Sequence, residues 1–274
     1  MIEQQWRYDG RRAVVTGCAS GIGAHVVRQL TELGAHVVGL DKHPPSTDGA
    51  EFHTVDLTDP ESIDHAVASV GGQVDALFNI AGVSSGIGDP PLVVTINFLG
   101  LRQLTEAVLE KMPDGSSIVS VSSLAASGYR EHQQIVGGLL NTATMAEGIE
   151  WCRRHPDTLA DGGYRLSKEA IILYTMRNTA ALGVRGIRIN CTGPGVTETP
   201  ILDQLRAAYG QHYLDDIPKP LGRVAEPAEQ AAVLVFLNSQ AASYISGQVI
   251  WVDGGNLGAA VARELEEGRA AWPV

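Results

Sequence analysis

A β-branched run, a glycine-rich turn and a helical pattern follow one another near the start of this 274-residue chain, and they constrain its fold most. The run covers residues 13–15, the turn TGCASGIG covers residues 16–23, and apolar residues then recur at helical spacing to Leu33. Glycines let a pyrophosphate approach the N-terminus of a helix, where free N–H groups attract anions. We therefore expect a dinucleotide to bind here, although a glycine turn without a ligand is the alternative. The residues expected to bind it are Gly17, Ser20, Gly21, Ile22 and Gly23.

Further apolar runs alternate with helical patterns along the chain. The predicted strands cover residues 36–40, 52–55, 74–78, 117–121, 186–191 and 248–252. Such alternation is typical of an α/β protein with a parallel sheet. We expect a single domain over residues 1–274, because single α/β domains of this length are ordinary.

Acidic residues end the second and third predicted strands. Asp41 can accept hydrogen bonds from the ribose hydroxyls of adenosine and repels a 2′-phosphate, which favours NAD over NADP. Lys42 and His43 stand beside it and could tolerate that phosphate. Asp56, followed by Leu57, is a candidate for binding the amino group of adenine.

Two other segments at strand ends are candidates for cofactor contacts. Small residues at the end of the fourth strand allow a ligand to contact the backbone, and ligands bind at this edge of open α/β sheets. The candidates there are Asn79, Ala81 and Gly82. The turn PGVTETP at residues 194–200 follows the sixth strand and is rich in hydroxyls. There, Pro194, Gly195, Thr197 and Thr199 are candidates for contacts with the carboxamide or phosphates of a nicotinamide cofactor.

Tyr164 and Lys168 lie four residues apart, so a helix that begins after two glycines places them on one face, although such pairs also occur by chance. A nearby ammonium stabilises a phenolate and lowers its pKa from about 10. Tyr164 would then exchange a proton with an alcohol oxygen near neutral pH. Ser123 follows the fifth strand and could face that oxygen. Asn97, inside a helical pattern over residues 92–112, either bonds locally or marks a kink that holds a water behind the lysine.

Forty residues separate Ser123 from Tyr164, far more than a strand-to-helix connection needs. Apolar residues recur at helical spacing from residue 135 to residue 149. We therefore expect the insertion at about 124–163 to contain its own helix and to act as a lid or a subunit contact. Residues 201–216 suit either an amphipathic flap over an apolar substrate or an ordinary surface helix.

The formal charge of −11, without a Lys/Arg-rich block, disfavours a nucleic-acid partner or an anionic membrane. Cys18, Cys152 and Cys191 are widely spaced, which indicates a reducing compartment and argues against a zinc site. No apolar run approaches the roughly 18 residues that span a bilayer, and the N-terminus lacks an apolar signal-peptide core. We expect a cytoplasmic protein without a metal.

Taken together, these motifs resemble those of the short-chain dehydrogenase/reductases. The matching residues are TGCASGIG at 16–23, NIAG at 79–82, Ser123, YRLSK at 164–168 and PG at 194–195. The resemblance implies a Rossmann-type doubly wound parallel sheet with helices on both faces, and hydride transfer between a nicotinamide cofactor and an alcohol or carbonyl. It also implies Tyr164 as general acid/base, Lys168 as pKa depressor and ribose ligand, Ser123 as donor to the substrate oxygen, and Asn97 as anchor of a water relay.

The long spacing between Ser123 and Tyr164 resembles the bacterial 3α-hydroxysteroid dehydrogenase/carbonyl reductase branch, and coniferyl-type aryl alcohol dehydrogenases look similar. With Asp41 favouring NAD, we expect an NAD-dependent dehydrogenase of a secondary or aryl-allylic alcohol, or of the matching carbonyl, with an apolar body. It also suggests a homo-oligomer, a dimer or tetramer, although the insertion puts the usual tetramer contacts in doubt. A regulator that binds NAD without chemistry is the alternative outside enzymes, and an enoyl reductase or a sugar-nucleotide epimerase is disfavoured.

Overall fold

Seven parallel strands form one sheet at the centre of the molecule, in the order β3-β2-β1-β4-β5-β6-β7. The computed structural model describes residues 3–45 and 50–268, so residues 1–2, 46–49 and 269–274 of the expected domain lie outside the described residues. The strands are β1 Arg12–Thr16, β2 His36–Asp41, β3 Glu51–Thr54, β4 Ala76–Asn79, β5 Ser117–Val121, β6 Arg188–Pro194 and β7 Val249–Val252. The chain winds outward from β1 in both directions, which confirms the predicted Rossmann-type doubly wound sheet.

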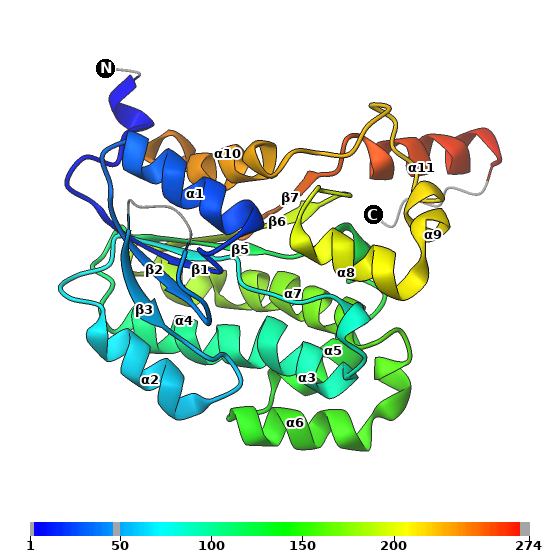
Figure 1. Cartoon of the computed structure of the whole chain (residues 1–274), viewed down its shortest axis with the longest axis horizontal. Coiled ribbons are helices and arrows are strands. Elements are labelled where there is room, and N and C mark those ends of the chain that lie inside the picture. Colours follow the sequence, from blue (N-terminus) through cyan, green and yellow to red (C-terminus); the bar gives the residue numbers. More distant parts are fainter. Residues whose placement is uncertain (1–2, 46–49, 269–274) are drawn as a thin grey trace.

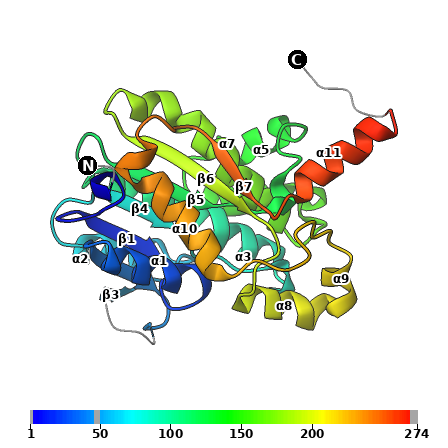
Figure 2. The same ribbon diagram turned by 90° about the horizontal axis from the view of Figure 1, so that it is seen from above.

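Helices cover both faces of this sheet (Figure 1), and the view from above in Figure 2 shows α1 and α10 side by side on one of them. That pair is α1 Gly21–Glu32 and α10 Pro227–Asn238. The opposite face carries α2 Pro60–Ser69, α4 Leu101–Leu109 and α7 Tyr164–Gly183. The remaining helices are α3 Pro90–Val94, α5 Gln133–Leu140, α6 Met145–Arg154, α8 Pro200–Tyr209, α9 Gln211–Asp215 and α11 Asn256–Glu266.

The hydrophobic core has two clusters, one on each face of the sheet, because successive side chains of a strand point to opposite faces. In β1, Val14 packs into the cluster beneath α2, α4 and α7. Ala13 and Val15 pack into the cluster beneath α1 and α10. All three side chains are fully buried, so both faces of the sheet belong to the core, as expected where helices cover both sides.

A helical run on the face of the sheet that carries α2, α4 and α7 has three parts. They are α3, a π-helical turn at Thr95–Gly100, and α4. By length and composition the run Pro90–Leu109 could cross a membrane. However, 67% of its most apolar window is buried inside the protein, as in a core helix of a soluble fold. The predicted helix over residues 92–112 is therefore present but interrupted at Asn97.

The insertion at 124–163 contains two helices, α5 and α6, where the periodicity predicts one. The chain turns between them, and the Thr144 hydroxyl accepts a hydrogen bond from the Glu147 N–H at 3.1 Å, which caps the start of α6. α5 packs along α7, where Arg177 donates to the Leu140 carbonyl and to the Asn141 side chain. The insertion thus adds a layer outside α7.

Candidate active site

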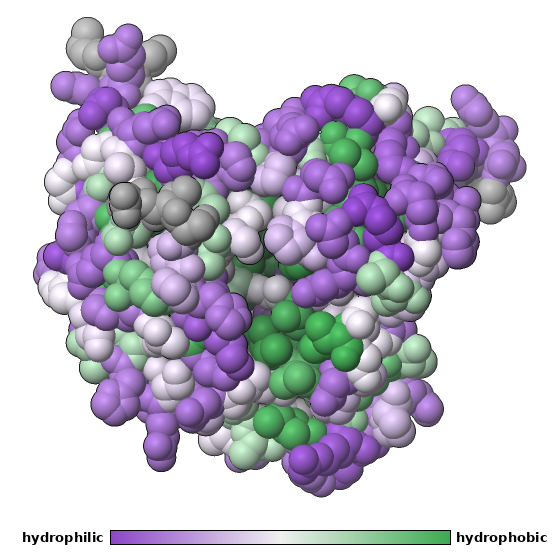
Figure 3. Space-filling view, viewed as in Figure 1, coloured by the Kyte–Doolittle hydropathy of each residue, from purple (hydrophilic) through white to green (hydrophobic). Residues whose placement is uncertain are grey.

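A cavity of about 760 Å³ opens at the carboxyl ends of β1, β2, β4, β5 and β6, where ligands bind in open α/β sheets. Figure 3 shows a hydrophobic patch beside the central hollow of this face. In the same view, Figure 1 places α8 above that patch. Most of the residues predicted for the site line this one cavity. They are Gly17, Ser20, Gly21, Ile22, Gly23, Asp41, Asp56, Leu57, Ala81, Gly82, Ser123, Tyr164, Lys168, Pro194, Gly195, Thr197 and Thr199.

The glycine turn between β1 and α1 forms a cradle that side chains would fill. Gly17 has a φ of +70°, and a Cβ there would lie 2.8 Å from the Ala81 Cα. A Cβ on Gly23 would overlap the Gly17 carbonyl oxygen. The first N–H groups of α1 have no acceptor within the helix and face this space. The cradle therefore fits a pyrophosphate, whose charge the helix N-terminus attracts.

Two carboxylates lie at the β2 and β3 side of the cavity. Asp41 accepts hydrogen bonds from the Ala19 N–H at 3.0 Å and from the His43 N–H at 3.2 Å. Asp56 accepts from Lys42 Nζ at 2.7 Å and from Thr58, and these bonds lower its pKa to about 2. Lys42 therefore already has an anionic partner, which the sequence did not reveal.

Asn79 does not line this cavity with its side chain, so its contact with the cofactor stays a prediction that concerns its backbone. Its side chain is buried beneath the sheet, where Nδ2 donates to Thr105 Oγ1 at 2.9 Å and to Ser120 Oγ at 3.3 Å. The next residue, Ile80, lines the cavity instead, because neighbouring residues of an extended chain face opposite sides.

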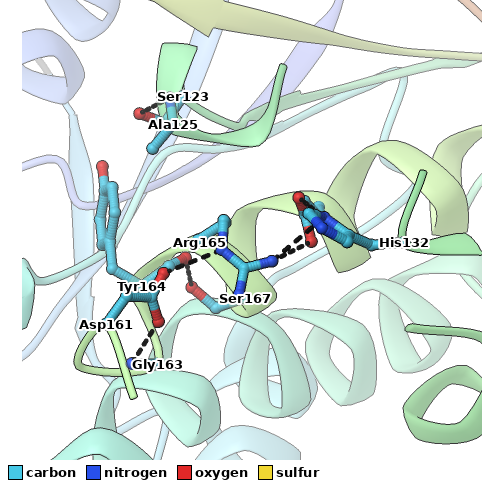
Figure 4. A network of polar contacts seen from close by, with 9 residues as sticks. Ser123, Ala125, His132, Asp161, Gly163, Tyr164, Arg165 and Ser167 are labelled. Carbon is cyan, nitrogen blue, oxygen red and sulfur yellow. Dashed lines mark hydrogen bonds and ion pairs between the residues drawn. The ribbon is translucent and has the colours of Figure 1, made fainter. Parts of the chain in front are cut away.

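Ser123 and Tyr164 face the cavity from different elements, the end of β5 and the first turn of α7. Figure 4 shows the Tyr164 ring directed towards the side where Ser123 lies, while Arg165 extends the other way to His132. Ser122 was the other hydroxyl at this strand end, and it donates to the Lys168 carbonyl at 2.7 Å. Ser123 is therefore the hydroxyl left to meet a ligand.

Burial dominates the pKa values of the tyrosine and the lysine. It raises the pKa of Tyr164, and the Ser123 hydroxyl counteracts this effect. It lowers the pKa of Lys168 to about 8. Lys168 Nζ lies 5.6 Å from the centre of the Tyr164 ring and donates to the Val121 carbonyl at 2.9 Å. Burial therefore sets the direction of the Tyr164 pKa in this structure, and the lowering of that pKa by Lys168 stays a prediction.

Asn97 lies behind the cavity without lining it. Its side-chain amide makes two hydrogen bonds to the Val83 backbone. Oδ1 accepts from the Val83 N–H at 2.8 Å, and Nδ2 donates to the Val83 carbonyl at 3.0 Å. Nδ2 also approaches Ser167 Oγ at 3.2 Å. A Cβ on Gly82 would meet Asn97 Oδ1 at 3.1 Å and Lys168 Nζ at 3.4 Å, so both side chains converge behind Gly82. The hydrogen bonds of Asn97 reach Val83 and Ser167, 14 and 70 residues away, rather than the neighbouring helical turn, and Asn97 lies in the π-helical turn Thr95–Gly100.

The other end of the cavity is mainly apolar, with a few polar groups. Leu92 comes from α3 and Ile96 from the π-helical turn that follows it. Leu202, Leu205 and Leu214 come from α8 and α9. The predicted flap over residues 201–216 therefore lines the cavity. From the insertion, residues 124 and 125 line the cavity, whereas α5 and α6 pack against neighbouring helices.

The predicted site left out several cavity residues, among them Thr58, Ile80, Ser85 and Gln204. Ile80 lies inside the NIAG motif and Thr58 follows Asp56 and Leu57 directly, so adjacency was an available signal for both. Ser85 and Gln204 carry no such signal, because distant segments bring them to the cavity.

Comparison with known proteins agrees with this geometry. Residues 11–135 match the family model described as short chain dehydrogenase, and residues 158–256 match the model described as Enoyl-(Acyl carrier protein) reductase. The chain is 37% identical to a coniferyl-alcohol dehydrogenase of Pseudomonas sp. (strain HR199 / DSM 7063) over 246 residues, covering 89% of this chain and 96% of that protein. It is 32% identical to a 3-alpha-hydroxysteroid dehydrogenase/carbonyl reductase of Comamonas testosteroni over 253 residues. That match covers 88% of this chain and 95% of that protein.

Among solved structures, the 3-alpha-hydroxysteroid dehydrogenase from Pseudomonas sp. B-0831 complexed with NADH is similar, with a TM-score of 0.78 and 31% identity. The match covers 95% of this chain and 100% of that one. Sequence, fold and cavity thus agree on one family. The chain belongs to the short-chain dehydrogenase/reductases, oxidoreductases that act on alcohols with a nicotinamide cofactor.

Proposed function

We propose that this protein is an NAD-dependent dehydrogenase of a secondary or aryl-allylic alcohol with an apolar body, or a reductase of the matching carbonyl compound. One observation carries the proposal: Ser123, Tyr164 and Lys168 line the same cavity, whose other walls are largely apolar. Coniferyl-type alcohols and 3α-hydroxysteroids are the two candidate substrate classes, since similar proteins carry those names.

In this proposal, each of the three side chains has a separate role in alcohol oxidation. Ser123 donates a hydrogen bond to the substrate oxygen and holds it near Tyr164. The Tyr164 phenolate accepts the hydroxyl proton. Lys168 supplies a buried cation behind the tyrosine and binds the cofactor ribose. A bound nicotinamide supplies the hydride acceptor.

The remaining cavity residues would bind the cofactor. Residues 17–23 would hold the pyrophosphate, and Asp41 would face the adenosine ribose, where its charge disfavours a 2′-phosphate. The ion pair between Lys42 and Asp56 supports NAD as well, because Lys42 is already engaged. Asp56 and Leu57 stay proposed contacts of the adenine ring, and Thr197 and Thr199 of the nicotinamide end. Asn97 stays the proposed anchor of a water relay behind Lys168.

We also propose a cytoplasmic homo-oligomer, a dimer or a tetramer. α5 and α6 lie against neighbouring helices of the same subunit, which favours a packing or interface role for the insertion over a lid. Light scattering of the purified protein tests the subunit number directly.

Replacing Tyr164 by Phe tests the reaction. The variant should retain NADH binding and lose about 10²- to 10⁴-fold in turnover, the usual contribution of a positioned acid/base. Initial rates at 340 nm with NAD and coniferyl-type or 3α-hydroxysteroid alcohols measure the loss. Near-normal turnover would reject Tyr164 as the acid/base. Tight NADH binding by the unmodified protein, without turnover of any alcohol, would favour the alternative of a nucleotide-binding regulator.

A further inference from the structure

The cavity wall made by α8 and the short helix Ser85–Ile87 carries a polar group that the proposed reaction does not use. Gln204 lines the cavity and comes from α8, whereas Ser123 and Tyr164 come from the β5 end and α7. Side-chain hydrogen bonds join α8 to the short helix, among them those from Ser84 Oγ to Gln204 Oε1 at 3.0 Å and from Tyr209 Oη to Ser85 Oγ at 3.0 Å. This wall is therefore fixed by bonds between segments about 120 residues apart.

The orientation of the Gln204 amide follows from its partner. The Ser84 hydroxyl accepts from the Gly86 N–H at 3.2 Å, so its own proton is available to Gln204 Oε1. The Ser84 N–H also points to Oε1, at 3.4 Å. Because both groups donate, the carbonyl oxygen of the amide must face Ser84, and the NH₂ group faces away.

Within residues 3–45 and 50–268, the Gln204 NH₂ group has no hydrogen-bond partner. Ser84 is nearly fully buried and Gln204 is half-buried, so the amide oxygen is held on the buried side. Since Gln204 lines the cavity, its two NH₂ donors are the part of the amide left for a ligand. Ile201 and Leu205, which line the cavity from the same helix, carry no acceptor side chain, and Ser85 Oγ on the facing helix already accepts from Tyr209. A ligand that fills this part of the cavity with carbon alone would leave the donors unpaired, which is unfavourable.

We propose that Gln204 is a specificity-determining residue that selects substrates carrying a second, hydrogen-bond-accepting oxygen on the apolar body, besides the reacting hydroxyl. This inference rests on the proposed function and extends it to the substrate class. An ether, carbonyl or phenol oxygen satisfies the chemistry, because each accepts a hydrogen bond from an amide NH₂.

The test compares NAD-linked oxidation of cinnamyl alcohol with that of its 3-methoxy and 4-methoxy derivatives, in the unmodified protein and in Gln204→Leu. A methoxy oxygen only accepts hydrogen bonds, so it probes the donor directly. We expect Gln204→Leu to lower kcat/KM about 3- to 10-fold for a methoxy derivative, the range for one neutral hydrogen bond, and to leave cinnamyl alcohol within about twofold. Gln204→Glu keeps an oxygen towards Ser84 but replaces the donor, and it should lose the same selectivity.

Tyr209→Phe is the matched control. It removes another bond between α8 and the short helix, and it leaves the Gln204 amide intact. We expect it to affect all three alcohols equally. If Gln204→Leu also changed all three equally, or none of them, the inference would be overturned while the proposed reaction stood.

Steroid substrates provide the second arm. If no cinnamyl alcohol is oxidised, the same variants are compared on 5α-androstan-3α-ol and on its 17-ketone, which differ in one acceptor oxygen. A selective loss on the ketone would support the inference, and an equal effect would overturn it. If the unmodified protein oxidises neither class, the proposed function fails and the inference falls with it.

Discussion

Tyr164 and Lys168 show how burial acts in opposite directions on an acid and a base. Removal from water disfavours the charged form of each, so the pKa of the phenol rises and that of the ammonium falls to about 8. Neither effect follows from their spacing of four residues, which fixes only that they share a helix face.

Lys168→Met should raise the free energy of unfolding of the cofactor-free protein by about 1–2 kcal/mol near pH 7. Burying an ammonium whose pKa falls from 10.5 to about 8 is unfavourable, and the lost bond to the Val121 carbonyl offsets part of the gain. Below about pH 8 the unfavourable effect is fully present. It fades as pH rises towards 10.5, because there the unfolded chain binds the proton that the folded chain has released. Urea unfolding measured across this range checks the trend, and a gain that is constant with pH would contradict it.

Alcohol oxidation should accelerate as pH rises from roughly 6 to above 8, because the raised pKa of Tyr164 leaves little phenolate at neutral pH. The measurement is kcat/KM for the alcohol at saturating NAD. Residual activity of Tyr164→Phe should lack this rise, which makes that variant the control. A flat profile in the unmodified protein would mean that another group carries the proton.

Among the elements, the insertion is tied to α7 through a buried carboxylate. Glu169 is 0% exposed, and its carboxylate pairs with two side chains. His132 Nδ1 lies 2.7 Å and Arg165 Nη1 lies 3.3 Å from its oxygens. Arg165 also pairs with Asp161, before α7, at 3.2 Å (Figure 4). The helix that carries Tyr164 and Lys168 is thus fastened on its outer side by the insertion.

Glu169→Gln should lower the free energy of unfolding by about 1–3 kcal/mol, because it leaves two cationic or polar partners facing a neutral group at a buried site. Denaturant unfolding at neutral pH measures the loss. Glu150→Gln is the matched control, since Glu150 is half-exposed and pairs with Arg153 and Arg154 on the surface. That control should change stability by less than about 0.5 kcal/mol, and equal losses in both variants would contradict the anchoring role.

For the whole molecule, the cavity draws on strand ends from β1 to β6, so a ligand in it contacts both halves of the sheet. NADH at about 100 times its Kd should stabilise the fold by about 2.7 kcal/mol and raise the Tm by about 5–10 °C. NADPH at the same concentration should raise the Tm less, because Asp41 repels a 2′-phosphate and Lys42 is paired with Asp56. Thermal unfolding with each nucleotide checks this order, and a larger shift with NADPH would reject NAD as the preferred cofactor.

The sequence alone determined the features that repeat over a few residues. Short continuous apolar runs predicted the strands, and the glycine turn before α1 and the Tyr164–Lys168 pair each depend on near neighbours in the chain. Their order along the chain, read together with the family resemblance, was enough for the doubly wound fold and for most of the cavity lining.

Only the tertiary structure decided what depends on distant neighbours. It buried the Asn79 side chain against Thr105 and Ser120, and it made burial the largest effect on the Tyr164 pKa. It also brought Gln204 to Ser84, 120 residues away in the chain. Local periodicity shows which way a side chain leaves its own helix or strand, but burial and bonding partners arise only when separate elements pack together.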